Sequence, residues 1–234
     1  MQRIKLPSVK EIKNGKLEKV IPELYALKGT VENNPWHNQE PVFDHVLSVL
    51  ENLGKIIRDS NKSITKLFDE IVDVNSKKDL LYLATLLHDI GKGETITDLG
   101  NGARGCPNHE KKSAQITEKI LKRFNLSPKE SKIIIDIVGN HGIIHDIIGL
   151  KCKNFKKGGE KEHDLTHAIA GLENKNFNEE YRKFKNKFSK IYPELIFLAF
   201  ADTVGSYLKK TEPSEFSCRI DFCKKEILSF YKTS

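Results

Sequence analysis

In the segment LLYLATLLHDIGK, residues 80–92, apolar side chains lie on every side of the predicted helix. A helix that is hydrophobic all round is buried inside a protein rather than lying on its surface. We therefore expect a central helix here, with Asp79 as its N-cap and Gly91 at its end. His88 and Asp89 then lie at the buried end of this helix.

A second apolar segment, residues 195–201, runs directly into Asp202. Burying an unpaired carboxylate is very costly, so Asp89 and Asp202 must either pair with lysine or arginine or hold a metal ion. The basic residues that follow them on their own helices are Lys92 and Lys209. The sequence also has eight histidines, and this supply of imidazoles favours the metal.

Three further histidines lie in predicted helices and can join the two aspartates. His45 lies on the edge of the apolar face of a helix expected over residues 42–58, His109 opens another helix, and His141 ends a third. Imidazole and carboxylate ligands without thiolate suit Mn, Fe, Co, Ni, Zn or Mg. The expected metal ligands are His45, His88, Asp89, His109, His141 and Asp202, enough for one ion or for a two-metal centre with open positions.

Helical periodicity dominates the rest of the chain, so the expected fold class is all-α, a helical bundle around the metal site in a single domain over residues 1–234. Ser127 and Glu130 form a capping box at the start of a helix that is expected to end near Asn140. Gly142 is expected to break this helix before His145.

Further helices are expected to begin at Asn108, Pro193 and Pro213. Residues 93–107 and 149–159 are rich in Gly and Asn and are predicted to be loops. No strand is expected. Residues 1–20 are predicted to form an N-terminal arm, and residues 211–234 an accessory helix or a homodimer contact.

Composition excludes several classes of protein. Of the 234 residues, 38% are hydrophobic and 30% are charged, which suits a globular core and neither a fibrous nor a disordered chain. The longest apolar run, residues 195–201, is too short to span a membrane, and no signal peptide or membrane contact is expected. The four cysteines show no zinc-type spacing and are interpreted as ordinary thiols, which fits a cytoplasmic location. The net charge of +7 favours polyanionic partners such as nucleotides or RNA, and no DNA-readout motif is found.

The ordered set of His45, His88-Asp89 and Asp202, with LLHDIGK at its centre, resembles the signature of the HD-domain metal-dependent phosphohydrolases. PELYALKG at residues 22–29, NPWH at 34–37 and the spacing on to His109 and His141 are similar to the HD domain of bacterial CCA-adding tRNA nucleotidyltransferases. The similarity covers residues 21–205. Those enzymes also carry a nucleotidyltransferase head with an Asp-x-Asp pair, which this sequence lacks, so CCA addition is not expected.

The resemblance implies a phosphohydrolase that acts on a nucleotide or RNA-terminus phosphate: a 2′,3′-cyclic phosphodiester, a 2′-nucleotide or a phosphomonoester. It implies that His45, His88, Asp89 and Asp202 hold one divalent ion and that Asp89 bridges to a second ion on His109 and His141. Water activated by the metal would attack phosphorus, with Asp89 and Lys92 as the catalytic residues. The candidate substrate-binding residues are Lys92, Arg104, His37, Trp36 and His145.

Two functions of other classes stay open. The domain can be a non-catalytic helical module that binds RNA through its basic stretches, residues 151–161 and 175–190. Some HD-fold proteins use the same four histidines and two aspartates to hold two irons and act as oxygenases. His163-Asp164 repeats the dipeptide in a polar context, and we interpret it, together with His167, as a solvated helix start rather than a site.

Overall fold

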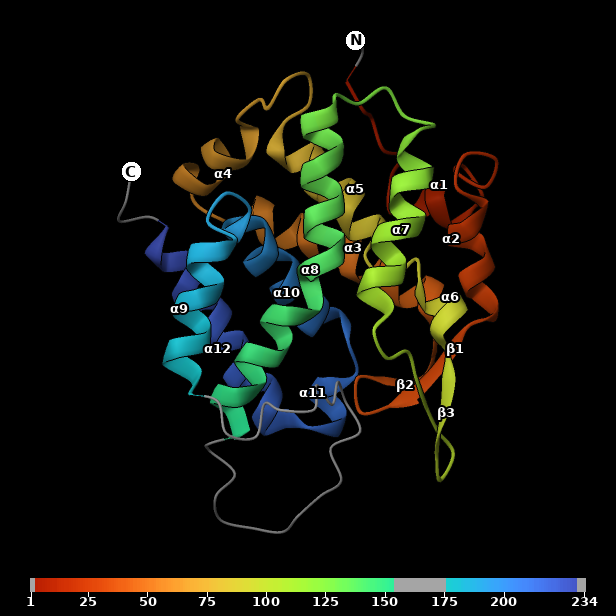
Figure 1. Cartoon of the computed structure of the whole chain (residues 1–234), viewed down its shortest axis with the longest axis vertical. Helices are drawn as coiled ribbons and strands as arrows, with labels where there is room; N and C mark the ends of the chain where they lie inside the picture. The colour runs from red at the N-terminus through yellow and green to blue at the C-terminus, as the bar shows by residue number, and fades with distance from the viewer. Residues whose placement is uncertain (1–2, 154–175, 231–234) are drawn as a thin grey trace.

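Four helices form the centre of the structure and carry most residues of the predicted metal site. The computed structural model describes residues 3–153 and 176–230. Helix α10 (Tyr192–Gly205) packs against α3 (Val42–Arg58), α5 (Lys77–Leu87) and α8 (Pro128–Lys153). Figure 1 shows these helices in the middle of the molecule. The prediction of an all-α helical bundle is confirmed.

Shorter elements surround this centre. They are helices α1 (Val9–Lys13), α2 (Pro22–Ala26), α4 (Lys62–Asp69), α6 (Lys92–Thr95), α7 (His109–Leu121), α9 (Phe177–Lys187), α11 (Leu208–Thr211) and α12 (Pro213–Ser229), the 3-10 helix η1 (Leu27–Gly29), and strands β1 (Val31–Asn34), β2 (His37–Pro41), β3 (Thr97–Gly100) and β4 (Ala103–Gly105).

Helix α5 is the buried helix that the sequence predicts. Leu80, Leu83 and Leu86 are fully buried, as expected for a helix without a polar face. The prediction of Asp79 as the N-cap is wrong, because Ser76 takes that position. The Asp79 carboxylate instead accepts hydrogen bonds from the backbone N (3.0 Å) and Oγ (2.6 Å) of Ser76, which closes a capping box from inside the helix.

Helix α8 continues through the glycine at which the sequence predicts a break. The predicted capping box forms at its start, since Glu130 N donates to Ser127 Oγ and Ser127 N donates to Glu130 Oε2. The helix then runs unbroken through Gly142, because its packing against α5, α7, α10 and α12 outweighs a propensity cost of about 1 kcal/mol for glycine. His145 therefore lies one turn beyond His141 on the same helix face.

Among the described residues, α8 is also the one helix long and apolar enough to cross a membrane, by length and composition alone. In this structure 56% of its apolar window is buried inside the protein. Such burial against five neighbouring helices is typical of the core helix of a folded domain.

A small antiparallel sheet lies at one end of the bundle, and the sequence analysis did not predict it. Its strand order is β2-β1-β4-β3. Strands β3 and β4, with helix α6, occupy most of residues 93–107, which were expected to be a loop. The strands contain only three to five residues each, too few to show a period of two in the sequence. The β1–β2 hairpin holds Glu32 and His37 against the helices.

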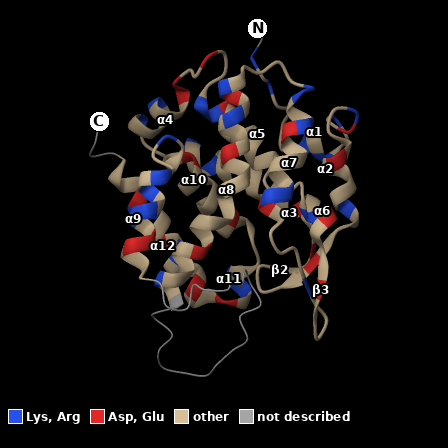
Figure 2. Cartoon of the chain, viewed as in Figure 1, with Lys and Arg blue, Asp and Glu red and all other residues tan. Residues whose placement is uncertain are grey.

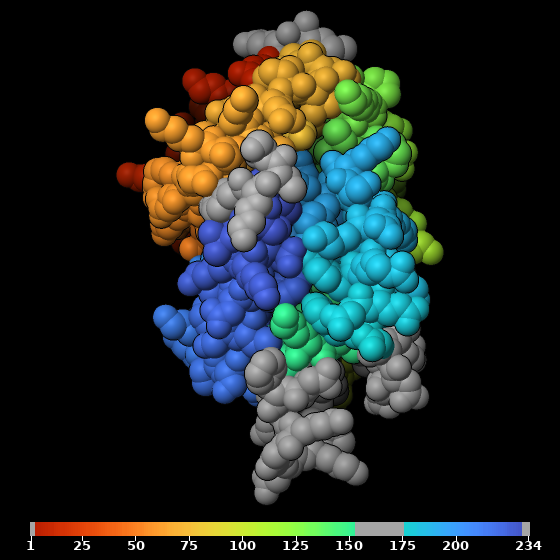
Figure 3. Space-filling view, turned by 90° about the vertical axis from the view of Figure 1, so that its left-hand side faces the viewer, coloured from red at the N-terminus to blue at the C-terminus, as the bar shows by residue number. Residues whose placement is uncertain are grey.

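Both terminal segments pack into the same core. Ile12 of α1 is fully buried, and its carbonyl accepts a 2.6 Å hydrogen bond from the Tyr25 hydroxyl. At the other end, Phe222 and Cys223 of α12 are buried. Figure 3 shows α12 beside α9, with the end of α8 between them. The predicted arm and accessory helix therefore contribute directly to the hydrophobic core.

A disulfide joins α12 to the end of α8. It links Cys218 to Cys152, which corrects the interpretation of all four cysteines as ordinary thiols, whereas Cys106 and Cys223 stay free. The two bonded cysteines are 66 positions apart. No local spacing could have indicated this pairing, because it depends on how the two helices pack.

Candidate metal centre

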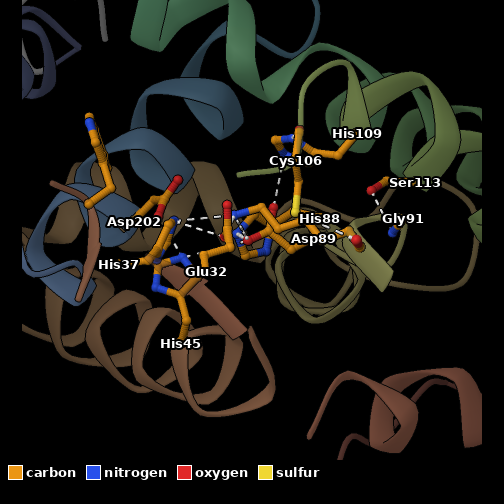
Figure 4. Close-up of polar contacts among 12 residues, drawn as sticks. Glu32, His37, His45, His88, Asp89, Gly91, Cys106, His109, Ser113 and Asp202 are labelled. Atoms are coloured by element: carbon orange, nitrogen blue, oxygen red, sulfur yellow. Dashed lines mark hydrogen bonds and ion pairs between the residues drawn. The ribbon is translucent and has the colours of Figure 1, made fainter. Parts of the chain in front are cut away.

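The six predicted ligands come together where five segments of the chain meet. Figure 4 shows Asp89 among His45, His88, His109 and Asp202. His45 comes from α3, His88 and Asp89 from the end of α5, His109 from the start of α7, His141 from α8 and Asp202 from α10. All six are buried, with at most 7% of any residue exposed. Asp89 lies at the centre: its Oδ1 is 3.0 Å from His109 Nε2, and its Oδ2 is 3.3 Å from His88 Nε2.

Three of the imidazoles are fixed in the tautomer that a metal ligand needs. Nδ1 of His88, His109 and His141 lies 2.7, 2.9 and 2.7 Å from the backbone carbonyl of the residue three positions earlier. A carbonyl only accepts, so each Nδ1 carries a proton, and Nε2 is the ring atom that is left to bind a metal ion. Outer hydrogen bonds of this kind orient histidine ligands in metalloproteins.

His45 and Asp202 form the opposite side of the cluster. His45 Nε2 lies 3.0 Å from Asp202 Oδ1 and 3.6 Å from Asp89 Oδ2. The other ring nitrogen of His45, Nδ1, faces Glu40 Oε2 at 3.7 Å, where the other three histidines face a carbonyl. The second oxygen of Asp202, Oδ2, lies 3.0 Å from His145 Nε2.

Both aspartates are ionised in this environment. Burial by itself raises the pKa of Asp89, but the neighbouring His88 and Lys92 outweigh it and hold that pKa well below its usual range. Burial is likewise outweighed at Asp202 by His145 and His45, which keep its pKa well below the ordinary value. The cluster therefore presents two carboxylates rather than two carboxylic acids.

Lys92 does not neutralise these carboxylates, because it is shared with a further acid. Its Nζ lies 3.0 Å from Asp89 Oδ2 and 2.6 Å from Oε2 of Glu32, a residue of β1 that is only 3% exposed. Burial lowers the pKa of Lys92, but Asp89 and Glu32 outweigh burial and raise it. Lys92 therefore balances only part of the negative charge of the three buried carboxylates, and the raised pKa values of His45 and His141 reflect the remainder, which favours a cation in the site.

Buried ligand atoms that make no hydrogen bond also favour a cation in this site. His88 Nε2 and Asp202 Oδ1 are buried and make no hydrogen bond within the described part of the chain. The ligand atoms of His45, His88 and Asp202 lie within 4.8 Å of one another, and so do those of His88, Asp89 and His141. Two ligand groups therefore exist, and they overlap at His88. Nitrogen and carboxylate ligands suit a divalent transition metal.

Glu110 adds a carboxylate that the sequence analysis did not assign. Ligand atoms of His109, Glu110 and His141 lie within 4.8 Å of one another. Gly142 makes room for the Glu110 side chain, because a Cβ at residue 142 would lie 2.0 Å from Glu110 Oε1. The adjacency of His109 and Glu110 was visible in the sequence, but their approach to His141 depends on the packing of α7 on α8.

The predicted substrate-binding residues separate into two groups. Trp36, His37, Lys92 and His145 line the small cleft beside the ligand cluster, together with Gly142. Arg104 lies on strand β4 with its side chain exposed, and it does not line this cleft. The dipeptide His163-Asp164 and His167 lie outside the described residues.

Comparison with known proteins agrees with this geometry. Residues 42–204 match the family model of the HD domain. The chain belongs to the HD domain family. The match begins at the first residue of α3 and ends just beyond Asp202, so it includes all six predicted ligands. Membership in this family implies a metal-dependent phosphohydrolase with a divalent ion.

More distant relatives contain an HD domain within a much longer chain. This HD protein is 26% identical over 127 residues to the bifunctional uridylyltransferase/uridylyl-removing enzyme of Methylococcus capsulatus, a match that covers 54% of this chain and 13% of that enzyme. It is 26% identical over 133 residues to the enzyme of the same name from Ruegeria pomeroyi, covering 57% of this chain and 13% of that one. The chain thus spans a small part of these relatives. The narrower similarity to CCA-adding enzymes stays a prediction.

Proposed function

We propose that the protein hydrolyses a nucleotide-type phosphoester: a 2′,3′-cyclic phosphodiester, a 2′-nucleotide or a terminal phosphomonoester. The observation that carries this proposal is the convergence of six buried histidine and aspartate side chains on one site, with Asp89 at its centre. A divalent ion at this site would supply Lewis-acid activation of water and of the phosphoryl oxygens. The two relatives from Methylococcus capsulatus and Ruegeria pomeroyi are named uridylyl-removing enzymes, and removing a uridylyl group also breaks a phosphoester of a nucleotide.

The protein's own residues supply the rest of the chemistry. Asp89 and Asp202 would hold the ion or ions, and the backbone carbonyls that accept hydrogen bonds from Nδ1 of His88, His109 and His141 fix the orientation of these imidazoles as further ligands. Lys92 lies beside Asp89, where its ammonium can neutralise charge that develops on a phosphoryl oxygen. Glu32 anchors Lys92 from the far side and so fixes the position of that charge.

The small size of the cleft favours a substrate that enters phosphate first. The cavity beside the ligands has a volume of about 20 Å³, room for about one water molecule. A phosphoryl group could replace that water at the ligands, whereas a nucleoside would have to lie at the rim. Trp36 and His145 belong to that rim, and an aromatic ring there offers a face for a base or ribose.

A panel of metals and substrates tests the proposal. Chelator-treated protein is supplied with Mn, Ni, Co, Mg or Fe and assayed against 2′,3′-cyclic AMP, 2′-AMP, deoxynucleotides and a chromogenic diester, with Asp89→Ala as the control. We expect hydrolysis of at least one nucleotide phosphoester that is lost in Asp89→Ala. Equal rates in both proteins would refute the assignment of the site.

The two alternative functions predict different results for the same proteins. An RNA-binding module would bind RNA in a salt-dependent way that survives Asp89→Ala and would hydrolyse nothing. Within the described residues its basic helix α9 is partly neutralised, since Lys183 pairs with Glu179 and Lys185 with Glu226. Figure 2 shows blue and red side by side on that helix. A di-iron oxygenase would retain iron and consume oxygen.

A further inference from the structure

Arg219 of α12 lies outside the segment that matches the HD domain, yet it reaches the metal cleft from behind. It is only 5% exposed. Its Nη1 donates a 2.8 Å hydrogen bond to the carbonyl of His145, and Glu215 holds Nε and Nη2 at 2.8 and 2.6 Å. The guanidinium also lies over the ring of Trp36, 4.8 Å from its centroid. These contacts fix a planar cation between α8, α12 and the β1–β2 turn.

The two residues that Arg219 contacts form one wall of the cleft. The rings of Trp36 and His145 meet edge to face with centroids 5.1 Å apart. His145 Nε2 in turn lies 3.0 Å from Asp202 Oδ2. Arg219 therefore supports the rim of the cleft on one side, while the metal ligands form its floor.

Neighbouring features of the chain hold this arrangement together. Gly149, one turn beyond His145, lets Arg219 approach α8, since a Cβ there would lie 3.2 Å from Nη2. The disulfide between Cys152 and Cys218 joins α8 to α12 directly before Arg219. The turn at Trp36 is also tied to the C-terminal segment, because Tyr207 N donates a 2.9 Å hydrogen bond to the Trp36 carbonyl.

We propose that Arg219 is a positioning residue that fixes Trp36 and His145 as the wall against which the nucleoside part of the substrate rests. This inference rests on the proposed function and deepens it, because it assigns recognition of the nucleoside to a part of the chain beyond the HD match. A preorganised wall improves binding by removing the cost of ordering it when the ligand arrives. The link from Arg219 to the predicted metal ligand Asp202 runs through His145, so we expect its loss to affect the nucleoside more than the metal or the phosphate.

The test uses Trp36 as its own reporter, because it is the one tryptophan of the sequence. Arg219→Gln and Arg219→Lys are compared with wild-type protein and with Arg123→Gln. Arg123 also forms a double contact with a glutamate, Glu23 at 2.8 and 2.6 Å, but does so on the outside of the molecule. Binding of 2′-AMP and of inorganic phosphate to the Mn-loaded proteins is measured by calorimetry, and Trp36 emission by fluorescence.

We expect Arg219→Gln to shift Trp36 emission and to weaken 2′-AMP binding about tenfold, the effect of losing roughly 1.4 kcal/mol. Phosphate affinity and manganese content should stay within about twofold of wild type, and Arg123→Gln should match wild type throughout. If Arg219→Gln does not fold, Arg219→Lys, which keeps the charge but loses the planar fork, serves instead.

Unchanged 2′-AMP affinity or unchanged Trp36 emission would overturn the role of Arg219, as would an equal loss of phosphate binding. The proposed function fails differently, namely if wild-type protein binds and hydrolyses no phosphoester. In that case the emission of Trp36 still shows whether Arg219 holds the wall.

Discussion

His109 Nε2 and His141 Nε2 lie 3.2 Å apart, although the two residues begin one helix and occupy the middle of another. Both Nδ1 atoms already donate to backbone carbonyls, so this contact needs a proton or a cation on one of the two Nε2 atoms, and Asp89 nearby raises the pKa of His141. Two facing lone pairs repel unless a proton or a cation lies between them. The backbone thus enforces an arrangement that a metal ion relieves.

Removal of His141 should therefore weaken metal binding more than removal of a histidine elsewhere. We expect His141→Ala to lower the affinity for Mn²⁺ at least tenfold, measured by competition with a fluorescent chelator. His163→Ala, which changes the histidine that we interpret as a solvated helix start, is the matched control. Equal affinities of the two variants would argue against His141 as a ligand.

Gly91 should prove essential because α7 packs directly on it. A Cβ at residue 91 would lie 2.4 Å from Ser113 N and 2.8 Å from His109 O. Gly91→Ala should therefore push away the turn that carries His109, lower the free energy of unfolding by about 1–3 kcal/mol and reduce bound metal. Gly93→Ala is the control, since the neighbours of its Cβ would be at 3.4 Å or more. Urea denaturation and metal analysis of both variants would show no difference if the contact were unimportant.

The sequence predicts the metal centre better than its surroundings, and the reason is physical. Asp89 and Asp202 each follow an apolar helix, so burial of charge could be inferred from adjacent residues. Glu32, Glu40 and Arg219 carry no such local signal, because each reaches the site from a different element. Their roles depend on tertiary packing, which one sequence does not reveal.

The errors in the predicted fold have the same origin. Gly142 is a helix breaker by propensity, and the packing of α8 against five other helices keeps it helical. The strands of residues 97–105 exist because β1 offers them a pairing partner some 70 positions away, as the contact of Asn33 with Arg104 shows. Long apolar helices such as α3 and α5, by contrast, were found from periodicity alone.

Lys92 and Glu32 should behave as a coupled buried pair. Lys92→Met leaves the Glu32 carboxylate buried and unpaired, and we expect it to lower the free energy of unfolding by about 3–5 kcal/mol. The double variant Lys92→Met/Glu32→Gln should recover part of that stability, because Glu32 no longer carries an unpaired charge, although Asp89 still lacks the ammonium. It should not recover hydrolysis, since the ammonium is lost. Additive effects in chemical denaturation of the single and double variants would contradict the coupling.

Glu194 should make stability depend on pH far from the metal centre. It is 3% exposed at the start of α10, its Oε2 makes no hydrogen bond within the described residues, and burial raises its pKa to about 7. Because this folded-state pKa exceeds the unfolded value of 4.5, its contribution to stability is greatest below pH 4.5 and is lost as the pH rises to 7. Between these two pH values the free energy of unfolding falls by about 3 kcal/mol because of Glu194.

Glu194→Gln should therefore stabilise the protein at pH 8 and change little at pH 4.5, as measured by urea midpoints. The exposed Glu18→Gln is the control and should show no such trend. A Glu194→Gln variant with the same gain at both pH values would show that the carboxyl group does not titrate in this range.

The account depends most on the claim that the buried histidines and aspartates converge to hold a catalytic cation. The direct test is the rate of 2′,3′-cyclic AMP hydrolysis as Mn²⁺ is titrated into chelator-treated protein, with Asp89→Asn in parallel. We predict no rate without metal, a rise that saturates at one or two ions per chain, and no rise in the variant. A chelator-treated protein that kept its full rate, or an Asp89→Asn variant that reached the wild-type rate, would contradict the account.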